Sequence, residues 1–175
     1  MTETQDSKAI LAIIENTEAM FERQRARIAA VWPKALGDSE RAISIIHSTI
    51  IKSKDLAEKC TPASLIVAAY TCAKLGLSPD PFLRLCSVVP RKGVAVVQVE
   101  YRGKIILATR SGWVKNIRAE AVFDNDYFEH QDGLTVTLVH KPYFTLGKPA
   151  RGKLLAAFAI ADLTNGAQTL MVLDM

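Results

Sequence analysis

The side chains best placed to do chemistry in this sequence are positively charged, and they are concentrated between Arg84 and Arg118. That stretch carries eight Lys and Arg side chains against a single acid, Glu100, whereas the whole chain has a net charge of only +4. Charges at this density repel one another, so a folded segment that carries them usually has an anionic partner. For a soluble domain inside the cell, the commonest such partner is a phosphate backbone. The alternative is a set of Arg and Lys side chains that are simply solvated.

Aromatic residues are interleaved with these cations. Single-stranded nucleic acid is bound by cations that follow its phosphates and by flat side chains on which its bases stack. Tyr101 directly precedes Arg102 and Lys104, and Trp113 lies two residues before Lys115. We expect Trp113 to pack in the core, while Tyr101 suits the core and a stacking role equally.

Three carboxylates have the spacing of a metal-dependent enzyme: Asp124, Asp126 and Glu129. Such a group can hold Mg²⁺ for a nuclease. Metal nucleases usually draw their carboxylates from separate elements and add a base, whereas these three lie in one short stretch. We therefore favour an acidic, solvated turn between strands and keep a Mg²⁺-dependent nuclease as the weaker alternative.

Several catalytic motifs are absent from the sequence. It contains neither GxxxxGK[ST] nor GxGxxG, which argues against strand exchange driven by a nucleotide. It also lacks CxxC, HExxH and GxSxG, which argues against a zinc site or a serine hydrolase. The three cysteines, Cys60, Cys72 and Cys86, are expected to be reduced thiols in the core. We therefore expect no catalytic site, no metal and no cofactor.

Helices are predicted for the first part of the chain. Apolar residues at helical spacing predict a long helix from Asp6 to Trp32 and a second one from Asp38 or Ser39 to about Lys54. Thr61-Pro62 is a typical start for a third helix, which Gly76 ends. This third helix is apolar nearly all round, so it should be central.

The basic segment itself should form a hairpin and then a helix. Arg91-Lys92-Gly93 is a turn signal, and the strand Val94 to Tyr101 should place its odd-numbered residues, Tyr101 included, on one face and Gln98 and Glu100 on the other. A short helix from Arg102 to Ser111 should follow. Arg102 and Arg110 are eight residues apart on it and should share a face, with Lys104 on a neighbouring face.

Strands should make up the remainder of the chain. We expect strands at Trp113–Phe123, Leu134–Val139, Leu154–Leu163 and Ala167–Leu173, with an acidic loop at Asp124–Asp132, a loop at Lys141–Pro149 and a type I′ turn at Asn165-Gly166. The predicted class is α+β, with N-terminal helices followed by a β-hairpin, a helix and an antiparallel sheet. No apolar run is long enough to span a membrane and the N-terminus lacks a signal-peptide pattern, so a cytoplasmic protein is expected.

An ordered series of short motifs resembles one known family. The series includes Leu75-Gly76-Leu77-Ser78-Pro79, Val97 to Gly103 (VQVEYRG), Leu107 to Gly112 (LATRSG), Asp126-Tyr127-Phe128-Glu129 and Leu138 to Pro142 (LVHKP). No single motif is diagnostic, but together, from about Ala42 to the last residue, they resemble the RecT family of phage single-strand DNA annealing proteins (the RecT and Red-beta type). The resemblance implies an annealing core at 38–175. The helix at 1–37 matches the family least well, and its own apolar stripe makes it a candidate oligomerisation arm. Proteins of this family continue beyond the position of Met175, so the resemblance also implies a core that is incomplete at its C-terminal end.

The resemblance implies a function and a set of contacts. The function is ATP-independent binding of single-stranded DNA and annealing of complementary strands in phage-type recombination, in a bacterial cell. The implied partners are single-stranded DNA, the annealed duplex, further copies of the chain in a ring or helical filament, and a 5′→3′ exonuclease. The candidate DNA contacts are Arg102, Lys104 and Arg110, then Arg91, Lys92, Lys115 and Arg118, with Tyr101 and Gln98 as stacking or polar contacts. A single-stranded nucleic-acid-binding module without annealing activity remains the main alternative.

Overall fold

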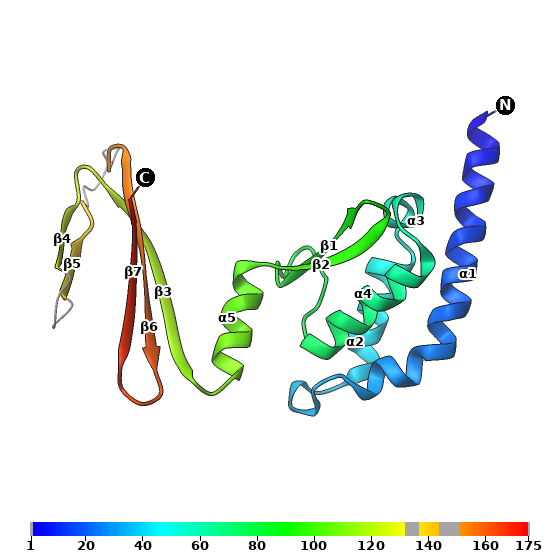
Figure 1. Ribbon diagram of the computed structural model, residues 1–175, viewed down its shortest axis with the longest axis horizontal. Helices are drawn as coiled ribbons and strands as arrows, with labels where there is room; N and C mark the ends of the chain where they lie inside the picture. The colour runs from blue at the N-terminus through cyan, green and yellow to red at the C-terminus, as the bar shows by residue number, and fades with distance from the viewer. Residues whose placement is uncertain (1, 132–136, 144–150, 175) are drawn as a thin grey trace. The chain divides into compact units, whose positions relative to one another are not determined.

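The computed structural model describes residues 2–131, 137–143 and 151–174 of the chain. Helices come first and antiparallel strands follow, which confirms the predicted α+β class (Figure 1). The chain divides into two compact units, Met1–Leu107 and Ala108–Met175. Each unit has its own apolar core, so the two are described in turn.

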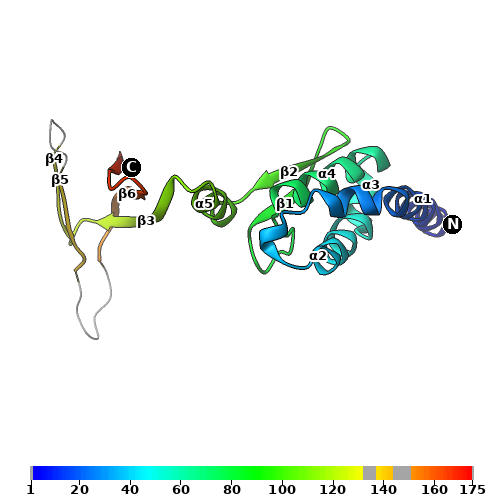
Figure 2. The same cartoon turned by 90° about the horizontal axis from the view of Figure 1, so that it is seen from below.

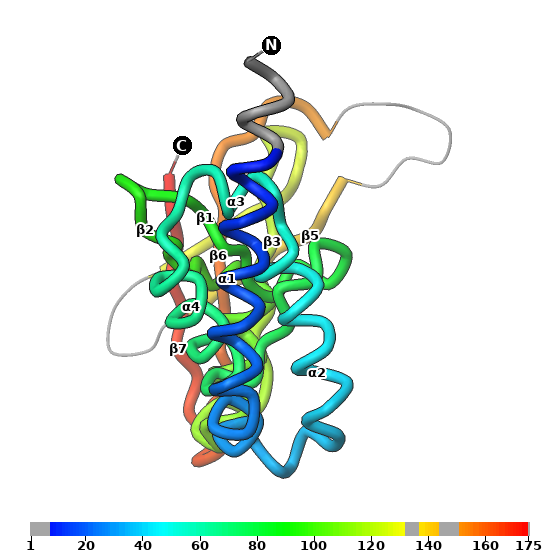
Figure 3. The backbone as a smooth tube through the Cα atoms, turned by 90° about the vertical axis from the view of Figure 1, so that its right-hand side faces the viewer, coloured from blue at the N-terminus to red at the C-terminus, as the bar shows by residue number. Residues whose placement is uncertain are grey.

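The first unit is built on helices. In order these are α1 (Thr2–Ala30), the short η1 (Lys34–Leu36), α2 (Ser39–Ile46), the π-helical η2 (His47–Ile51), α3 (Lys54–Lys59) and α4 (Pro62–Leu75). Helix α4 is apolar on most sides and lies against α1 (Figure 3). It begins where expected, with the Thr61 hydroxyl accepting from the Ser64 N–H, and it ends at Gly76 in a left-handed conformation. The three cysteines are buried free thiols in this core, as predicted.

The second helix is capped by Asp38 as predicted, but it ends a few residues before the predicted Lys54 and its last turn is π-helical. Helix α2 passes into a π-helical turn, the helix stops at Lys52, and Ser53 caps the new helix α3 by accepting from the Leu56 N–H at 3.3 Å. A π-turn inserts an extra residue into the helix. The adjacent Ile50 and Ile51 of this turn are both fully buried.

The predicted hairpin is present as β1 (Cys86–Arg91) and β2 (Val94–Val99). Its two turn residues, Lys92 and Gly93, both have positive φ, as a type I′ turn requires. Two bonds fix the hairpin on the start of α4: the Thr61 N–H donates to the Gly93 carbonyl, and the Ala95 N–H donates to the Ser64 hydroxyl, each at 3.0 Å. The odd-numbered side chains of β2 point inward as expected.

The strand ends earlier than predicted. Val99 is the last residue of β2, and Tyr101 begins helix α5 (Tyr101–Arg110) instead of continuing the inward face. The Glu100 N–H donates to the Leu85 carbonyl at 3.0 Å, which turns the chain from the strand into the helix. Gly103 follows in the first turn of α5, where the same Leu85 carbonyl lies too close for any Cβ.

The second unit is a small β-structure. Strands β3 (Val114–Phe123), β6 (Leu154–Leu163) and β7 (Gln168–Asp174) form an antiparallel sheet in the order β3-β6-β7. Strands β4 (Tyr127–Gln131) and β5 (Thr137–Lys141) pair with each other beside that sheet (Figure 2). The core lies between the two layers and consists of Val122, Ala156 and Phe158, with Phe128 and Leu138 packed against them.

Two predictions for this unit need correction. Most of the expected acidic loop after Phe123 is strand β4, because Tyr127–Gln131 pairs residue by residue with β5. The hairpin at Asn165-Gly166 exists, but only Gly166 has positive φ, so the turn is not type I′. The Gly166 N–H donates to the Leu163 carbonyl, which gives a longer turn with a glycine at its end.

Residues 132–136 and 144–150, which include parts of one predicted strand and one predicted loop, lie outside the described residues. None of the helices in the described ranges is long and apolar enough to cross a membrane.

Candidate nucleic-acid interface

The tip of the β1–β2 hairpin presents two of the predicted cations. Arg91 and Lys92 are both exposed, and the bond from Thr61 to Gly93 holds the turn that carries them. The Arg91 guanidinium donates to the amide oxygen of Gln98 on the opposite strand, at 3.4 Å. Gln98 therefore positions a cation at this tip.

The start of α5 presents the second pair of cations together with an aromatic ring. The Tyr101 side chain is 61% exposed. Of the two roles considered for it, core residue or stacking ring, its exposure favours the stacking ring. The Arg102 Nε–H donates to the Tyr101 hydroxyl at 3.0 Å, and the centre of the guanidinium lies 5.8 Å from the centroid of the ring. This contact restrains both side chains and keeps a flat ring and a positive charge next to each other.

Lys104 is not on a face next to Arg102. An α-helix turns about 100° per residue, so the two side chains leave α5 about 200° apart. Gly103 lies between them on the buried side of the helix. The cations of the first unit are therefore spread out, with Arg102 and Lys104 on either side of α5. The hairpin tip lies at the far end of β2, about 17 Å away at 3.3 Å per residue.

The other predicted cations lie beyond Leu107, in the second unit. Arg110 is the last residue of α5, and Lys115 and Arg118 are exposed on β3. Arg118 lies 3.9 Å from the Asp162 carboxylate of β6, a loose and exposed ion pair. Its charge therefore has a partner within the sheet.

Trp113 is not a core residue, contrary to prediction. Its side chain is 75% exposed in the turn between α5 and β3. The backbone there is held on both sides: the Trp113 N–H donates to the Ser111 hydroxyl and the Trp113 carbonyl accepts from the Thr164 N–H at 3.0 Å. A fixed backbone with an outward indole is the arrangement that base stacking requires.

Sequence reasoning missed the segment before β1. Phe82 is 92% exposed, in a turn that Asp80 closes by accepting the Phe82 N–H at 2.9 Å. Arg84 follows with φ of 52°, which is uncommon for a residue other than glycine. The signal was available in the Pro-Asp-Pro-Phe sequence, because two prolines around an Asp predict a turn, and turns usually lie at the surface.

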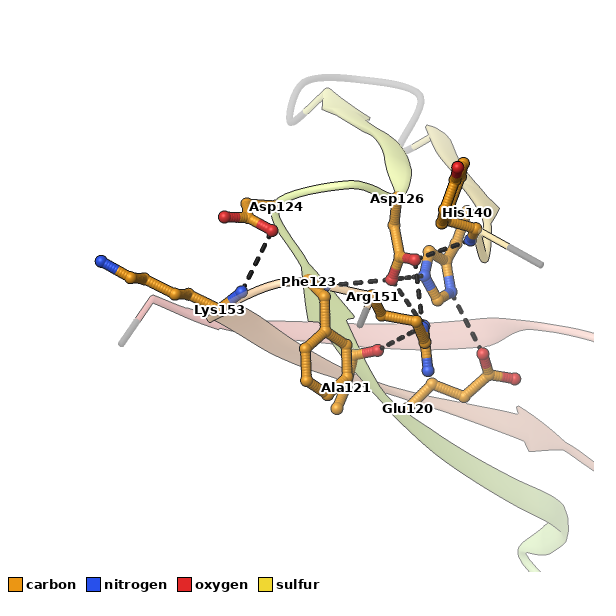
Figure 4. Close-up of polar contacts among 9 residues, drawn as sticks. Glu120, Ala121, Phe123, Asp124, Asp126, His140, Arg151 and Lys153 are labelled. Carbon is orange, nitrogen blue, oxygen red and sulfur yellow. Dashed lines mark hydrogen bonds and ion pairs between the residues drawn. The ribbon is translucent and has the colours of Figure 1, made fainter. Parts of the chain in front are cut away.

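The acidic cluster is a structural network and not an open metal site. The Asp126 side chain is completely buried, and its carboxylate accepts from the Arg151 guanidinium, the backbone N–H of Tyr143 and the backbone N–H of Phe123 (Figure 4). The hydrogen bond from Arg151 is the main reason why the pKa of Asp126 is far below its ordinary value. The carboxylate is therefore charged and fully occupied by donors of the protein.

The other two carboxylates of the predicted group point to different partners. Asp124 accepts from the backbone N–H of Lys153 at 3.0 Å, and Glu129 accepts from the Tyr127 hydroxyl at 2.7 Å. No group of three His, Cys, Asp or Glu side chains that could hold a metal ion occurs among the described residues. Asp124, Asp126 and Glu129 therefore do not converge on one site.

His140 completes this network, and the sequence alone did not assign it. One ring nitrogen lies 3.1 Å from Glu120 on β3 and the other lies 3.1 Å from Asp126. The histidine of β5 is thereby tied to β3 and to the turn before β4. Its partners are 14 and 20 residues away in sequence, so no local pattern could have revealed them.

A small α+β protein whose exposed aromatic rings are interleaved with cations has the surface expected of a nucleic-acid-binding domain. Comparison with known proteins specifies the family. The model of the RecT family matches residues 39–175, and the chain belongs to that family.

Two relatives show how far the similarity extends. Protein RecT of Escherichia coli (strain K12) is 29% identical over 178 residues, a match that covers 95% of this chain and 64% of RecT. The uncharacterized protein YqaK of Bacillus subtilis (strain 168) is 32% identical over 95 residues, which covers 54% of this chain and 34% of YqaK. The chain thus spans less than two-thirds of the length of either relative.

Proposed function

We propose that this chain binds single-stranded DNA and anneals complementary strands without ATP, as a component of phage-type homologous recombination. The observation that carries the proposal is the RecT family match over residues 39–175, which includes every cation named above. The exposure of Tyr101, Trp113 and the basic side chains around them supports it physically.

The proposed activity needs no chemical step. Two complementary strands repel each other through their phosphates, and each is also folded on itself. Protein cations that bind the phosphates reduce this repulsion and extend the strand. Because contacts to phosphates leave the base edges free, the bases themselves select the complementary sequence. The free energy comes from base pairing, so a nucleotide-binding site is not required.

The proposed contacts fall into two groups. In the first unit the phosphate contacts are Arg102, Lys104, Arg91 and Lys92, with Tyr101 as a stacking ring and Gln98 as the residue that positions Arg91. In the second unit they are Arg110, Lys115 and Arg118, with Trp113 added as a stacking ring. The further partners that we propose on family grounds are the annealed duplex, copies of the same chain in a ring or filament, and a 5′→3′ exonuclease.

An annealing assay tests the proposal directly. Two complementary oligonucleotides, one with a fluorophore and one with a quencher, are mixed with this chain without any nucleotide over a range of salt concentrations. We expect faster quenching than without protein, and less acceleration at high salt. Tight binding of single strands without acceleration would instead favour a binding module that does not anneal. Cleavage of a labelled strand when Mg²⁺ is added would contradict an annealer.

Single substitutions test the contacts. Arg102→Ala and Lys104→Ala should each weaken single-strand binding and reduce the slope of log K against log[salt] by roughly 0.7 for each lost phosphate contact. Lys54→Ala is the matched control, because Lys54 is an exposed lysine of α3 outside the basic segment. An unchanged slope in folded Arg102→Ala and Lys104→Ala proteins would remove these residues from the interface.

A further inference from the structure

A hollow opens beside Tyr101 in the first unit. It has a volume of about 440 Å³ and is lined by Pro81, Arg84, Cys86, Ser87, Glu100 and Tyr101. Sites of about 300–1,000 Å³ that combine apolar walls with a few polar groups are the usual size for small, flat ligands. The proposed phosphate contact Arg102 is hydrogen-bonded to the tyrosine of this wall, so the hollow borders the proposed path of the DNA.

The walls of the hollow are held in place by bonds of their own. Arg102 restrains the ring of Tyr101. On the other side, Asp80 closes the turn that contains Pro81 through bonds to the N–H groups of Phe82 and Leu83. A preformed site loses less conformational entropy when a ligand binds.

The polar groups of the hollow are a carboxylate and a hydroxyl that already face each other. The Ser87 hydroxyl donates to Glu100 Oε1 at 2.8 Å, and both side chains are half-buried. A carboxylate has about four acceptor positions, so this single donor leaves capacity for the N–H groups of a ligand. Glu100 is also the single acid of the basic segment, and a negative group here would repel a phosphate. The hollow therefore suits a neutral, flat ligand with N–H donors.

We propose that this hollow receives a single nucleobase of the bound strand, that it favours a base with an exocyclic amino group, and that the other bases keep their edges free to pair. This inference rests on the proposed binding of single-stranded DNA. The base stacks against Tyr101 and donates its amino hydrogens to Glu100, while Arg84 and Arg102 at the rim bind the adjoining phosphates. Cytosine, adenine and guanine carry such an amino group, whereas thymine and uracil present a carbonyl oxygen at the corresponding position, which the carboxylate repels.

Cytosine and uracil differ mainly in that one group, so they provide the sharpest test. The dissociation constants of deoxycytidine and deoxyuridine oligonucleotides of equal length are measured by fluorescence anisotropy at one salt concentration and pH 7.5. A good carboxylate–amino contact discriminates by about 1 kcal/mol or more, so we expect the deoxycytidine strand to bind roughly fivefold more tightly or better. Equal binding of both strands overturns the base site and leaves the proposed function standing. Failure to bind either strand overturns both.

Two variants assign the preference to these residues. Glu100→Gln keeps the shape and an acceptor for Ser87 but adds an amide donor, so the preference for cytosine should vanish. Glu58→Gln, an exposed acid of α3, is the matched control and should retain it. Tyr101→Ala should weaken binding of both strands, whereas Tyr101→Phe should largely restore it. If the Glu100→Gln protein has the same melting temperature as the unmodified chain and still prefers the deoxycytidine strand, the proposal is contradicted. The proposal is also contradicted if Glu100→Gln changes the mass of the oligomer but leaves the base preference unchanged. In that case the hollow binds a second copy of the chain.

Discussion

At the scale of single residues, the buried Asp126 side chain accepts hydrogen bonds from several segments of the second unit. Its donors come from the end of β3, from β5 and from the segment before β6, so one buried carboxylate joins three stretches of chain to the turn in which it lies. A buried charge is tolerated only when it is paired and hydrogen-bonded, and the Arg151 guanidinium meets this requirement. Carboxylate spacing in a sequence therefore cannot distinguish a metal ligand from a structural ion pair.

The lowered pKa of Asp126 predicts how stability depends on pH. Folding favours the charged carboxylate, so its contribution is complete above the unfolded value near 4 and is lost progressively as the pH falls below it. We expect thermal unfolding, followed by circular dichroism between pH 3 and pH 7, to shift to lower temperature on acidification. Asp126→Asn should be less stable than the unmodified chain at pH 7 and should respond less to acid.

Glu129→Gln is the control for that experiment, because the Glu129 side chain is exposed and accepts its hydrogen bond from Tyr127, two residues away. It should leave the melting curves nearly unchanged at every pH. If Asp126→Asn melts like the Glu129→Gln control at pH 7, the buried network does not stabilise the unit.

The residues of the candidate interface were only partly predictable. Charge density alone identified the exposed cations, because Arg and Lys are almost never buried without a partner. The environment of an aromatic side chain depends instead on residues that are distant in sequence. The backbone of Trp113 is fixed through Ser111 and Thr164, and its ring is 75% exposed among the residues that the structure describes.

At the scale of elements, local signals predicted boundaries well. Thr61-Pro62 and Gly76 bound α4 as expected, and the hairpin turn lies at Lys92-Gly93. The errors occurred where distant residues decide the structure. Strand β4 contains charged and histidine residues and is a strand because it pairs with β5.

Gly103 predicts a test of how α5 joins the hairpin. A Cβ at this position would lie 2.1 Å from the Leu85 carbonyl oxygen and 3.0 Å from a methyl group of Val99. The carbonyl is held by the Glu100 N–H, so it cannot readily move away. We expect Gly103→Ala to lower the free energy of unfolding by about 1–3 kcal/mol, measured by urea denaturation. Helix propensity alone predicts the opposite sign, since alanine favours a helix by up to about 1 kcal/mol over glycine.

Lys104→Ala is the control for that substitution, because it changes the next residue of α5 at an exposed position. It should leave the free energy of unfolding nearly unchanged. A Gly103→Ala protein as stable as this control would show that the close approach to Leu85 is not needed.

At the scale of the whole molecule, the proposed association of copies of the chain concerns α1. Its burial decreases toward the N-terminus: Thr17, Phe21 and Ile28 are fully buried, whereas Leu11 is 50% exposed. The neighbouring Ile10, Ile13 and Ile14 are half-buried, so this end of the helix has an apolar surface that the first unit covers only in part. We propose that this surface packs against a second copy.

Leu11→Asp tests this arm. A charge in a packed apolar contact is unfavourable because it loses its hydration. We expect a lower average mass in analytical ultracentrifugation, both alone and with single-stranded DNA, while the circular dichroism spectrum stays the same. Ala19→Asp adds the same charge at an exposed position further along α1 and should leave the mass unchanged. Equal masses for the two variants would contradict packing of α1 against a second copy.

A lower mass of Leu11→Asp together with slower annealing would connect association of the copies to the proposed activity, because a long single strand is extended over its length when several copies bind side by side.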